Sequence, residues 1–350
     1  MPPINQALIA KKLNLSRSTV SRSLANHPAI SAETRAIVNE QAESVGYKLS
    51  PGRVSRRHIR PDRKVTLGVL IGIPAEKVEM VTFPHVLSGM RECAEAERVK
   101  LDILYQAPGD FHPESGRQTF FRQVRNGDWR GVLLIYPFAE KAVEVIARKI
   151  STVAVLESYE FPTVDTIDTD EVSGIVTLVG HLVAAGHRRI GFMTWDYPIG
   201  GHWSMQRFGG YVEALFAYGL PFQQEWVLNI QKDTPRLTPE QLCDTVAARI
   251  RKDRVTAWVC AADHQAYPLI QGLRHRGLRV PEDCSVTGFD GLDHPASEKP
   301  VSTMKVPHAD IGSSAVSRLL NRIVYPLAPR RKILVEASFV PGQTIATPPR

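Results

Sequence analysis

The sequence has few of the residues on which redox, metal and membrane chemistry depend. Its four cysteines lie far apart in 350 residues, without a C-x-x-C pair and without histidines at metal-ligand spacing. No apolar run approaches the ~18 residues of a membrane span, and the N-terminus lacks the basic segment and apolar stretch of a secretory signal. These absences predict a reduced, metal-free, cytoplasmic protein with no membrane partner.

Motifs that anchor cofactors and catalysis are also missing. No G-x-G-x-x-G or Walker A loop follows any apolar run of strand length, so nucleotide chemistry has no anchor. The sequence also lacks a G-x-S-x-G nucleophile elbow and an H-E-x-x-H zinc motif. We expect a protein that has no cofactor and is not an enzyme.

Positive charge is concentrated at the N-terminus. Residues 1–64 contain 12 Lys and Arg against 4 Asp and Glu, a net charge of +8, whereas residues 65–350 have a net charge of −1. A basic block of this kind is either a disordered tail or a folded module that binds a polyanion. The apolar periodicity within the block favours the folded module.

The first 47 residues are predicted to form three short helices, one at 6–13, one at 17–24 and a third that Ser31 caps and Gly46 ends. Ser16 is the expected N-cap of the second helix, and Asn14 is expected in the left-handed conformation of the preceding turn. This spacing is typical of a helix-turn-helix. Leu8, Ile9 and Leu13 share one face of the first helix. The expected core of this small domain contains Leu15, Val20, Ile37, Val38, Ala42 and Val45.

From residue 65 onward, apolar runs of strand length alternate with helical patterns. Because these runs are continuously apolar, they predict a parallel sheet buried on both faces, and hence a doubly wound α/β fold. The predicted strands are 65–73, 101–105, 132–136, 153–156, 190–194, 257–261 and 285–289.

Several motifs along the chain form one recognisable series. They are Ala10-x-x-Leu13-Asn14-Leu15-Ser16-x-x-Thr19-Val20-Ser21-Arg22-x-Leu24, Ile30-Ser31-x-x-Thr34-Arg35, Gly46-Tyr47, His181-Leu182-x-x-x-Gly186-His187-Arg188-Arg189-Ile190-Gly191, Arg207-Phe208-x-Gly210-Tyr211, Cys260-Ala261-Ala262-Asp263 and the stretch from Gly277 to Asp290. This series resembles the LacI/GalR repressor family and covers nearly the whole chain.

The resemblance implies an all-α helix-turn-helix DNA-binding domain at 1–49, a hinge helix and basic linker at 50–64, and an α/β effector domain at 65–350. The effector domain would have two doubly wound parallel-sheet subdomains, joined by three crossover strands as in a periplasmic binding protein, with a ligand between them.

The resemblance also implies which residues contact DNA. Arg17, Ser18 and Arg22 occupy the positions from which the family's recognition helix reaches base edges, and Arg can bond bidentately to guanine. The alternative for these three residues is a solvated polar helix face. Phosphate contacts or helix caps are implied for Ser16, Thr19, Ser21, Ser31 and Thr34, and further DNA contacts for Asn26 and Tyr47.

The hinge departs from the family pattern. Its usual Pro-Asn pair is Leu49-Ser50, its small residue is Arg53, and the Leu that wedges into the minor groove is Arg56. We expect Arg53 and Arg56 to hold DNA by charge, with less kinking than an apolar wedge produces. The alternative is that these arginines are solvated linker charges.

In the effector domain, the resemblance places Arg207, Asp263 and Asp290 in the ligand cleft. Local alignment adds Phe83, Asp170 and Trp203. One Arg and two carboxylates facing a cleft would match the hydroxyl groups of a sugar. The alternatives are core or lid packing for Phe83 and Trp203, and a helix cap for Asp290.

Together these features predict a sequence-specific transcriptional regulator, a repressor that binds a palindromic operator as a homodimer. A small polar ligand, a sugar or sugar derivative, is expected to control it. The alternatives on the same fold are a solute receptor and a sugar-modifying enzyme, and a third is an architectural DNA binder without sequence preference.

Overall fold

The computed structural model describes residues 6–24, 30, 32–45, 65–73, 83–111, 119–196, 202–230 and 235–349. They divide into two compact units, Met1–Val65 with Leu320–Ala328, and Thr66–Leu319 with Pro329–Arg350. Each unit is described by itself. No helix in these ranges combines the length and the apolarity that a membrane span requires.

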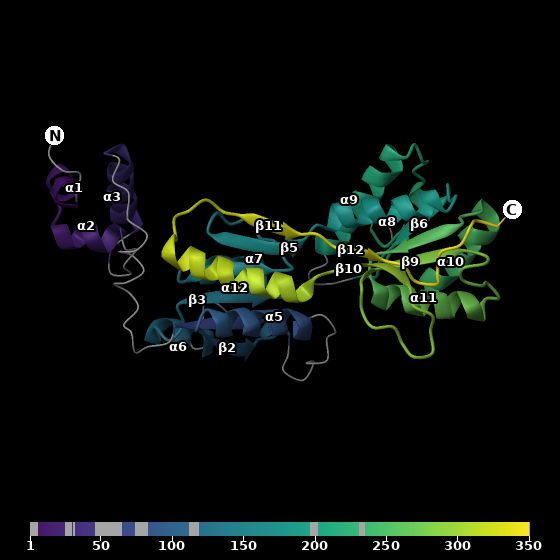
Figure 1. The fold of residues 1–350 in the computed structure, drawn as a ribbon, viewed down its shortest axis with the longest axis horizontal. Helices are drawn as coiled ribbons and strands as arrows, with labels where there is room; N and C mark the ends of the chain where they lie inside the picture. The colour runs from purple at the N-terminus through teal and green to yellow at the C-terminus, as the bar shows by residue number, and fades with distance from the viewer. Residues whose placement is uncertain are drawn as a thin grey trace. The chain divides into compact units, whose positions relative to one another are not determined.

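The N-terminal unit contains the three predicted helices, α1 (Gln6–Leu13), α2 (Arg17–Leu24) and α3 (Ala32–Ser44) (Figure 1). Asn14 adopts the expected left-handed conformation, with a φ of 52°. The Ser16 cap is also confirmed, because the Thr19 amide donates to Ser16 Oγ at 3.0 Å. The buried core of these helices consists of Ile9, Ala10, Val20, Val38 and Ala42, with Leu13, Leu15, Leu24 and Val45 packed against it.

The prediction that Ile37 belongs to this core is wrong. Its side chain is 47% exposed, whereas the neighbouring Val38 is fully buried. Consecutive residues on a helix point about 100° apart, so a core of this size takes only one of the two.

The second unit is built around two six-stranded sheets. The first contains β1 (Thr66–Ile71), β2 (Lys100–Tyr105), β3 (Gly131–Ile135), β4 (Ser151–Val155), β5 (Val164–Thr169) and β11 (Lys332–Val335), all parallel, in the order β11-β5-β4-β3-β1-β2. The helical segments between its strands are α5 (Phe83–Ala96), η2 (Pro108–Asp110), α6 (Thr119–Asn126) and α7 (Glu140–Ala147).

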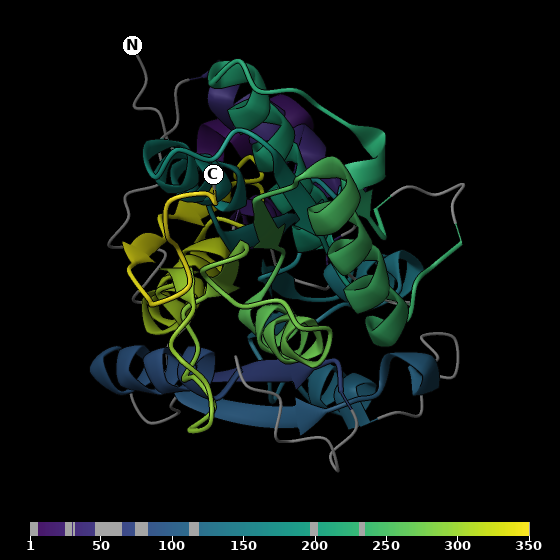
Figure 2. The ribbon, with the colours of Figure 1, turned by 90° about the vertical axis from the view of Figure 1, so that its right-hand side faces the viewer.

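The second sheet contains β6 (Ile190–Met193), β7 (Val227–Leu228), β8 (Ala257–Cys260), β9 (Ser285–Asp290), β10 (Ser302–Lys305) and β12 (Ser338–Val340), in the order β12-β10-β9-β8-β6-β7. Only β12 runs antiparallel to its neighbour. The accompanying elements are α8 (Glu171–Ala184), α9 (His202–Ala217), η3 (Gln224–Trp226), α10 (Pro239–Asp253) and α11 (Asp263–His275). In Figure 2 the green helices α10 and α11 face the viewer.

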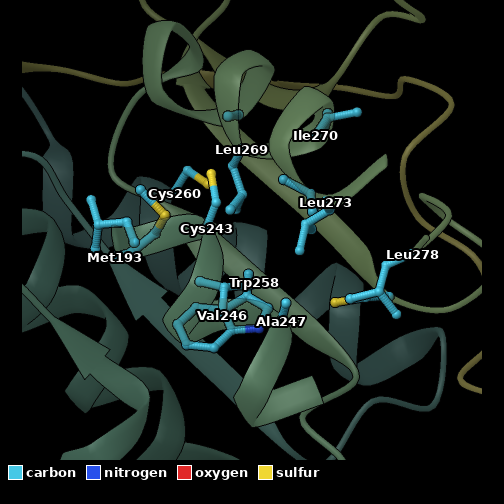
Figure 3. Packing of buried hydrophobic residues seen from close by; sticks show 14 of the residues in the cluster. Met193, Cys243, Val246, Ala247, Trp258, Cys260, Leu269, Ile270, Leu273 and Leu278 are labelled. Carbon is cyan, nitrogen blue, oxygen red and sulfur yellow. The ribbon is translucent and has the colours of Figure 1, made fainter. Parts of the chain in front are cut away.

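The core of the second sheet is centred on Trp258, which is fully buried in β8. Val246 and Ala247 of α10 and Leu269 and Leu273 of α11 belong to the same cluster (Figure 3). Apolar groups from both helices therefore cover one face of the sheet and fix the carboxyl ends of its strands.

The chain crosses between the two sheets three times, after β5, after β10 and after β11. The second crossing leads into α12 (His308–Val324), which runs beside α5 (Figure 1). These helices approach so closely that a Cβ at Gly312 would lie 2.1 Å from the carbonyl oxygen of Val86. Two sheets with three crossings confirm the predicted fold class.

Each of the seven apolar runs contains a strand, but five other strands were not predicted: β5, β7, β10, β11 and β12. β7 has two residues and β12 has three, and β11 is largely exposed at the edge of its sheet. β5 is fully buried but reads Val-Asp-Thr-Ile-Asp-Thr, so its pattern is not apolar.

Candidate functional sites

The exposed face of α2 carries the three residues predicted to read bases. Arg17, Ser18 and Arg22 are exposed, whereas Val20 and Ser23 are buried against the other helices. This arrangement presents two guanidinium groups and a hydroxyl to solvent on a helix of eight residues. A recognition helix needs this combination of a buried and a polar face.

The hydroxyl groups at the start of α2 are engaged with one another. Ser16 Oγ lies 2.7 Å from Ser18 Oγ and 2.8 Å from Thr19 Oγ1, besides accepting from the Thr19 amide. Thr19, Ser21 and Thr34 are half-buried. Asn26, Ser31, Tyr47, Arg53 and Arg56 lie outside the described residues, so their assignments stay predictions.

A second cluster forms around Arg207, which is only 4% exposed on α9. Its Nε donates to Glu171 Oε2 at 2.6 Å and its Nη2 donates to Glu171 Oε1 at 3.1 Å. Nη2 also donates to Asp290 Oδ1 at 2.9 Å, and Nη1 donates to the Ala261 carbonyl at 2.5 Å. One guanidinium group thus joins α8, β9 and the loop after β8.

Aromatic rings enclose the same guanidinium group. Its central carbon lies 3.9 Å from the centroid of the Phe289 ring and 4.6 Å from that of Trp203. Trp203 is half-buried. Cation–π contacts with two rings hold the Arg207 plane in one orientation.

Burial controls the protonation of this cluster. It raises the pKa of Glu171 to about 7, although the charge of Arg207 acts in the opposite direction. The negative charges of Asp290 and Glu171 raise the pKa of Arg207 despite the desolvation of its guanidinium. Arg207 therefore stays charged, and Glu171 is the member of the pair that can take up a proton near neutral pH.

The Arg207 cluster lies at the carboxyl edge of the second sheet. Ala261 follows β8, and Asp290 is the last residue of β9. In this sheet β6 pairs with both β7 and β8, so the strand order reverses there. Doubly wound sheets bind ligands outside the carboxyl ends of their strands at such a switch point.

Strained backbone also gathers at the carboxyl ends of strands. Tyr136 after β3, Leu156 after β4 and Asn229 after β7 have φ values of 67°, 58° and 63°, and Asp290 has 115°. Non-glycine residues in this region cost about 1–3 kcal/mol each and are typical of functional sites. At Asp290 this conformation directs a carboxylate toward Arg207.

Asp263 is buried next to this cluster, but both of its oxygens are already bonded within the protein. Oδ1 accepts from Thr303 Oγ1 at 2.7 Å, and Oδ2 accepts from the Leu292 amide at 2.9 Å. Burial raises the pKa of Asp263 to about 7, and the charge of Asp290 adds to this effect. In this geometry Asp263 fixes the loop after β9 and the start of β10.

The structure thus brings Trp203, Arg207 and Asp290 into contact, with Asp263 behind them. Asp170 instead caps α8, where its Oδ1 accepts from the Ser173 amide at 3.0 Å. The side chain of Phe83, at the start of α5, lies outside the described part of the chain. Asp290 ends a strand and pairs with Arg207, so the helix-cap alternative for it is wrong.

Sequence reasoning missed Glu171, the main partner of Arg207. It directly follows Asp170, which the local alignment selected, and begins α8, which packs on α9. An acidic residue at the start of a helix usually reads as a favourable interaction with the helix dipole. No signal in one sequence indicated that it would meet Arg207, which lies 36 residues further along the chain.

Comparison with known proteins agrees with both halves of this description. Residues 9–50 match the model of bacterial regulatory proteins of the lacI family, and residues 179–345 match that of a periplasmic binding protein-like domain. The NTD biosynthesis operon regulator of Bacillus subtilis is 25% identical over 350 residues, with 95% of this chain and 96% of the relative covered. The transcriptional repressor CytR of Escherichia coli is 26% identical, with 90% and 88% covered.

Solved structures show the same fold. A transcriptional regulator CelR–cellobiose complex superposes with a TM-score of 0.62 at 20% identity, covering 99% of this chain and 100% of the other. The lac repressor dimer bound to operator and the anti-inducer ONPF superposes with a TM-score of 0.61 at 19% identity, covering 97% and 98%.

The fold and the two matched domains define a helix-turn-helix protein with a periplasmic-binding-protein-like domain. The chain belongs to the LacI/GalR family. Like its curated relatives, it is a transcriptional regulator and not an enzyme.

Proposed function

We propose that this chain is a repressor in the bacterial cytoplasm that binds a palindromic operator as a homodimer and responds to a small sugar-like ligand. Residues 1–49 would bind DNA, residues 50–64 would form the hinge, and residues 65–350 would bind the ligand and dimerise. The repressor names of its relatives support the first part, and a solved relative with bound cellobiose supports the second.

The observation that carries the ligand assignment is the state of Arg207. Four of its five N–H groups are bonded to Glu171, Asp290 and the Ala261 carbonyl, which leaves one Nη1 hydrogen without a partner among the described residues. A rigid, charged donor beside the indole of Trp203 is suited to a polar ring with hydroxyl groups.

The test begins with selection of the operator from random DNA by the full-length protein. Fluorescence anisotropy with the selected DNA and a panel of mono- and disaccharides then identifies compounds that change affinity. We expect at least one compound to change the operator Kd by about 5–150-fold, the usual range of allosteric coupling. A protein that selects no sequence, or that no polar compound affects, would contradict the proposal.

Two aromatic variants separate ligand binding from DNA binding. Trp203→Ala removes the ring beside Arg207 and should abolish the ligand response while leaving operator affinity unchanged. Phe222→Ala is the matched control, since its ring is 49% exposed and packs near the ring of Phe208, not near Arg207. An unchanged response in Trp203→Ala would remove this cluster from the ligand site.

A further inference from the structure

Two buried carboxylates near the Arg207 cluster have no cationic partner in the described part of the chain. Glu157 follows β4 and is 8% exposed, and Asp168 lies on β5 and is 3% exposed. The Ser158 amide donates to Glu157 Oε1 at 3.4 Å, and the Thr169 amide donates to Asp168 Oδ1 at 2.9 Å. Among the described residues, nothing donates a hydrogen bond to the second oxygen of either group.

The nearby positive charges are already committed or distant. Arg207 is held by Glu171 and Asp290 at 2.6 and 2.9 Å. Lys332, Arg207 and His202 influence Asp168 electrostatically, but none of them forms an ion pair with it in the described part of the chain. Among the described residues, Glu157 forms no ion pair, and the charged group that most affects its pKa is Asp168.

The pKa values of both carboxyl groups are raised. Burial raises the pKa of Glu157 to about 7, and the negative charge of Asp168 adds to the shift. Burial also raises the pKa of Asp168. Carboxylates this deeply buried are normally paired, because an unpaired buried charge is costly.

The arrangement calls for a ligand with positive charge and several donors. A neutral hydroxyl group can donate to Glu157 or Asp168, but it brings no positive charge to stabilise the ionised form of either carboxyl group. An ammonium group supplies three N–H donors and a full positive charge. The unassigned Nη1 hydrogen of Arg207 then remains for an oxygen of the same molecule.

We propose that the effector carries an amino group, as an amino sugar does, and that Glu157 and Asp168 bind its ammonium. The proposal rests on the assignment of the Arg207 cluster as the effector site. It narrows the ligand class from neutral sugars to aminated ones and makes Glu157, which neither the sequence nor the comparisons singled out, a residue that determines specificity.

Matched pairs of compounds test this choice on the full-length protein. Thermal unfolding at neutral pH and constant ionic strength is measured with glucosamine and glucose, galactosamine and galactose, mannosamine and mannose, and putrescine and 1,4-butanediol. We expect at least one amine to bind tenfold or more tightly than its hydroxyl counterpart. Glu157→Gln and Asp168→Asn should each remove that preference.

Glu160→Gln is the matched control, because this carboxylate is three residues away with an 89% exposed side chain. It should keep the amine preference. Without ligand, Glu157→Gln should unfold at the same or a higher temperature than the wild type, since it removes an unpaired buried charge. A lower unfolding temperature would mean that Glu157 is needed for folding and would overturn the proposal.

These measurements test the amine assignment and the proposed function separately. A neutral sugar that binds as tightly as its amine, and that also changes operator affinity, overturns the amine assignment and leaves the proposed function standing. An amine preference that persists in Glu157→Gln also overturns the amine assignment. If no compound stabilises the protein or changes operator affinity, both proposals fail.

Discussion

At the scale of single residues, Arg207 forms ion pairs with two buried carboxylates, Glu171 and Asp290. Replacing it with Leu leaves Glu171 and Asp290 as buried carboxylates without a cation, and breaking a buried ion pair in this way costs about 3–5 kcal/mol. We expect urea unfolding of Arg207→Leu to show such a loss in the free energy of unfolding. The loss should be smaller at pH 5 than at pH 8, because Glu171 can then be protonated.

The control for this measurement is an exposed ion pair. Arg148 pairs with Glu144 one turn earlier at 2.6 Å, but their side chains are 74% and 41% exposed. Arg148→Ala should therefore cost no more than about 0.5 kcal/mol. Similar losses in the two variants would show that the Arg207 pairs contribute little.

The buried Asp263 predicts a pH dependence of stability. Its pKa is about 7 in the folded chain, mainly through burial, against about 3.9 in an unfolded chain. The folded state thus binds this proton more tightly, so the contribution to stability is complete below about pH 4 and is lost as the pH rises through about 7. Asp263→Asn should make the fall in unfolding free energy between these pH values shallower, by up to ~1.4 kcal/mol per pH unit.

Asp263→Asn can preserve the local bonds, because the Thr303 hydroxyl can accept from the new amide while its oxygen accepts from Leu292. Asp283→Asn serves as the control, since hydrogen bonds from Arg279 lower the pKa of Asp283 to about 2, and its stabilisation is lost at more acidic pH. If Asp263→Asn left the pH dependence of the unfolding free energy unchanged, the raised pKa of Asp263 would be contradicted.

Single residues were predictable where a motif fixed them. Arg207 and Asp290 stand inside family motifs, and the structure places them in contact. Glu157, Asp168 and Glu171 were not predicted, because their importance depends on burial and on partners distant in the chain. A carboxylate in one sequence looks the same whether it is solvated or buried.

At the scale of secondary-structure elements, α2 carries the prediction about DNA. Arg22 lies one turn after Ser18 on its exposed face. Arg22→Ala should weaken binding to the selected operator by roughly 1–3 kcal/mol and change binding to random DNA much less. Lys12→Ala, on the exposed end of α1, should lower affinity for both DNAs to a similar extent. Equal losses on both DNAs in Arg22→Ala would argue against base reading.

The packing of α9 on α8 predicts opposite effects at two adjacent glycines. A Cβ at Gly210 would lie 2.7 Å from the Val172 carbonyl oxygen, whereas a Cβ at Gly209 would have nothing within 4 Å. Gly210→Ala forces the helices apart and should cost about 1–3 kcal/mol. Gly209→Ala should stabilise the chain by ~0.5–1 kcal/mol, because alanine favours a helix. Urea unfolding of both variants gives the two changes in the free energy of unfolding. If both variants were stabilised, or both destabilised, the close contact at Gly210 would be contradicted.

A helix or strand could be predicted from the sequence where the polarity of its residues matched their burial. This holds for the three N-terminal helices and for seven strands. It does not hold for β5, because Asp165 is buried in it as the ion-pair partner of Arg318 of α12, at 2.6 Å. A tertiary contact over 153 residues makes that strand possible, and no local pattern reveals it.

At the scale of the whole molecule, the main prediction concerns assembly. One helix-turn-helix reads one half-site, so a palindrome requires two chains. The basic N-terminal domains repel each other, and we therefore expect residues 65–350 to supply the dimer contacts. Sedimentation of the full-length protein at micromolar concentration should give a dimer, with two chains on each palindrome. A monomer, or one chain per palindrome, would contradict this.

The three crossings between the two sheets are short. One residue separates β5 from α8, two separate β10 from α12, and two separate β11 from β12. Each residue spans at most ~3.6 Å, so the two sheets, each with its helices, cannot separate or slide by more than a few ångströms. The motion that remains is a rotation of one sheet relative to the other about the narrow strip that the three crossings form. An effector bound as proposed would then act by changing the angle between the two sheets, which a single pair of distance labels, one on α7 and one on α10, would be enough to follow.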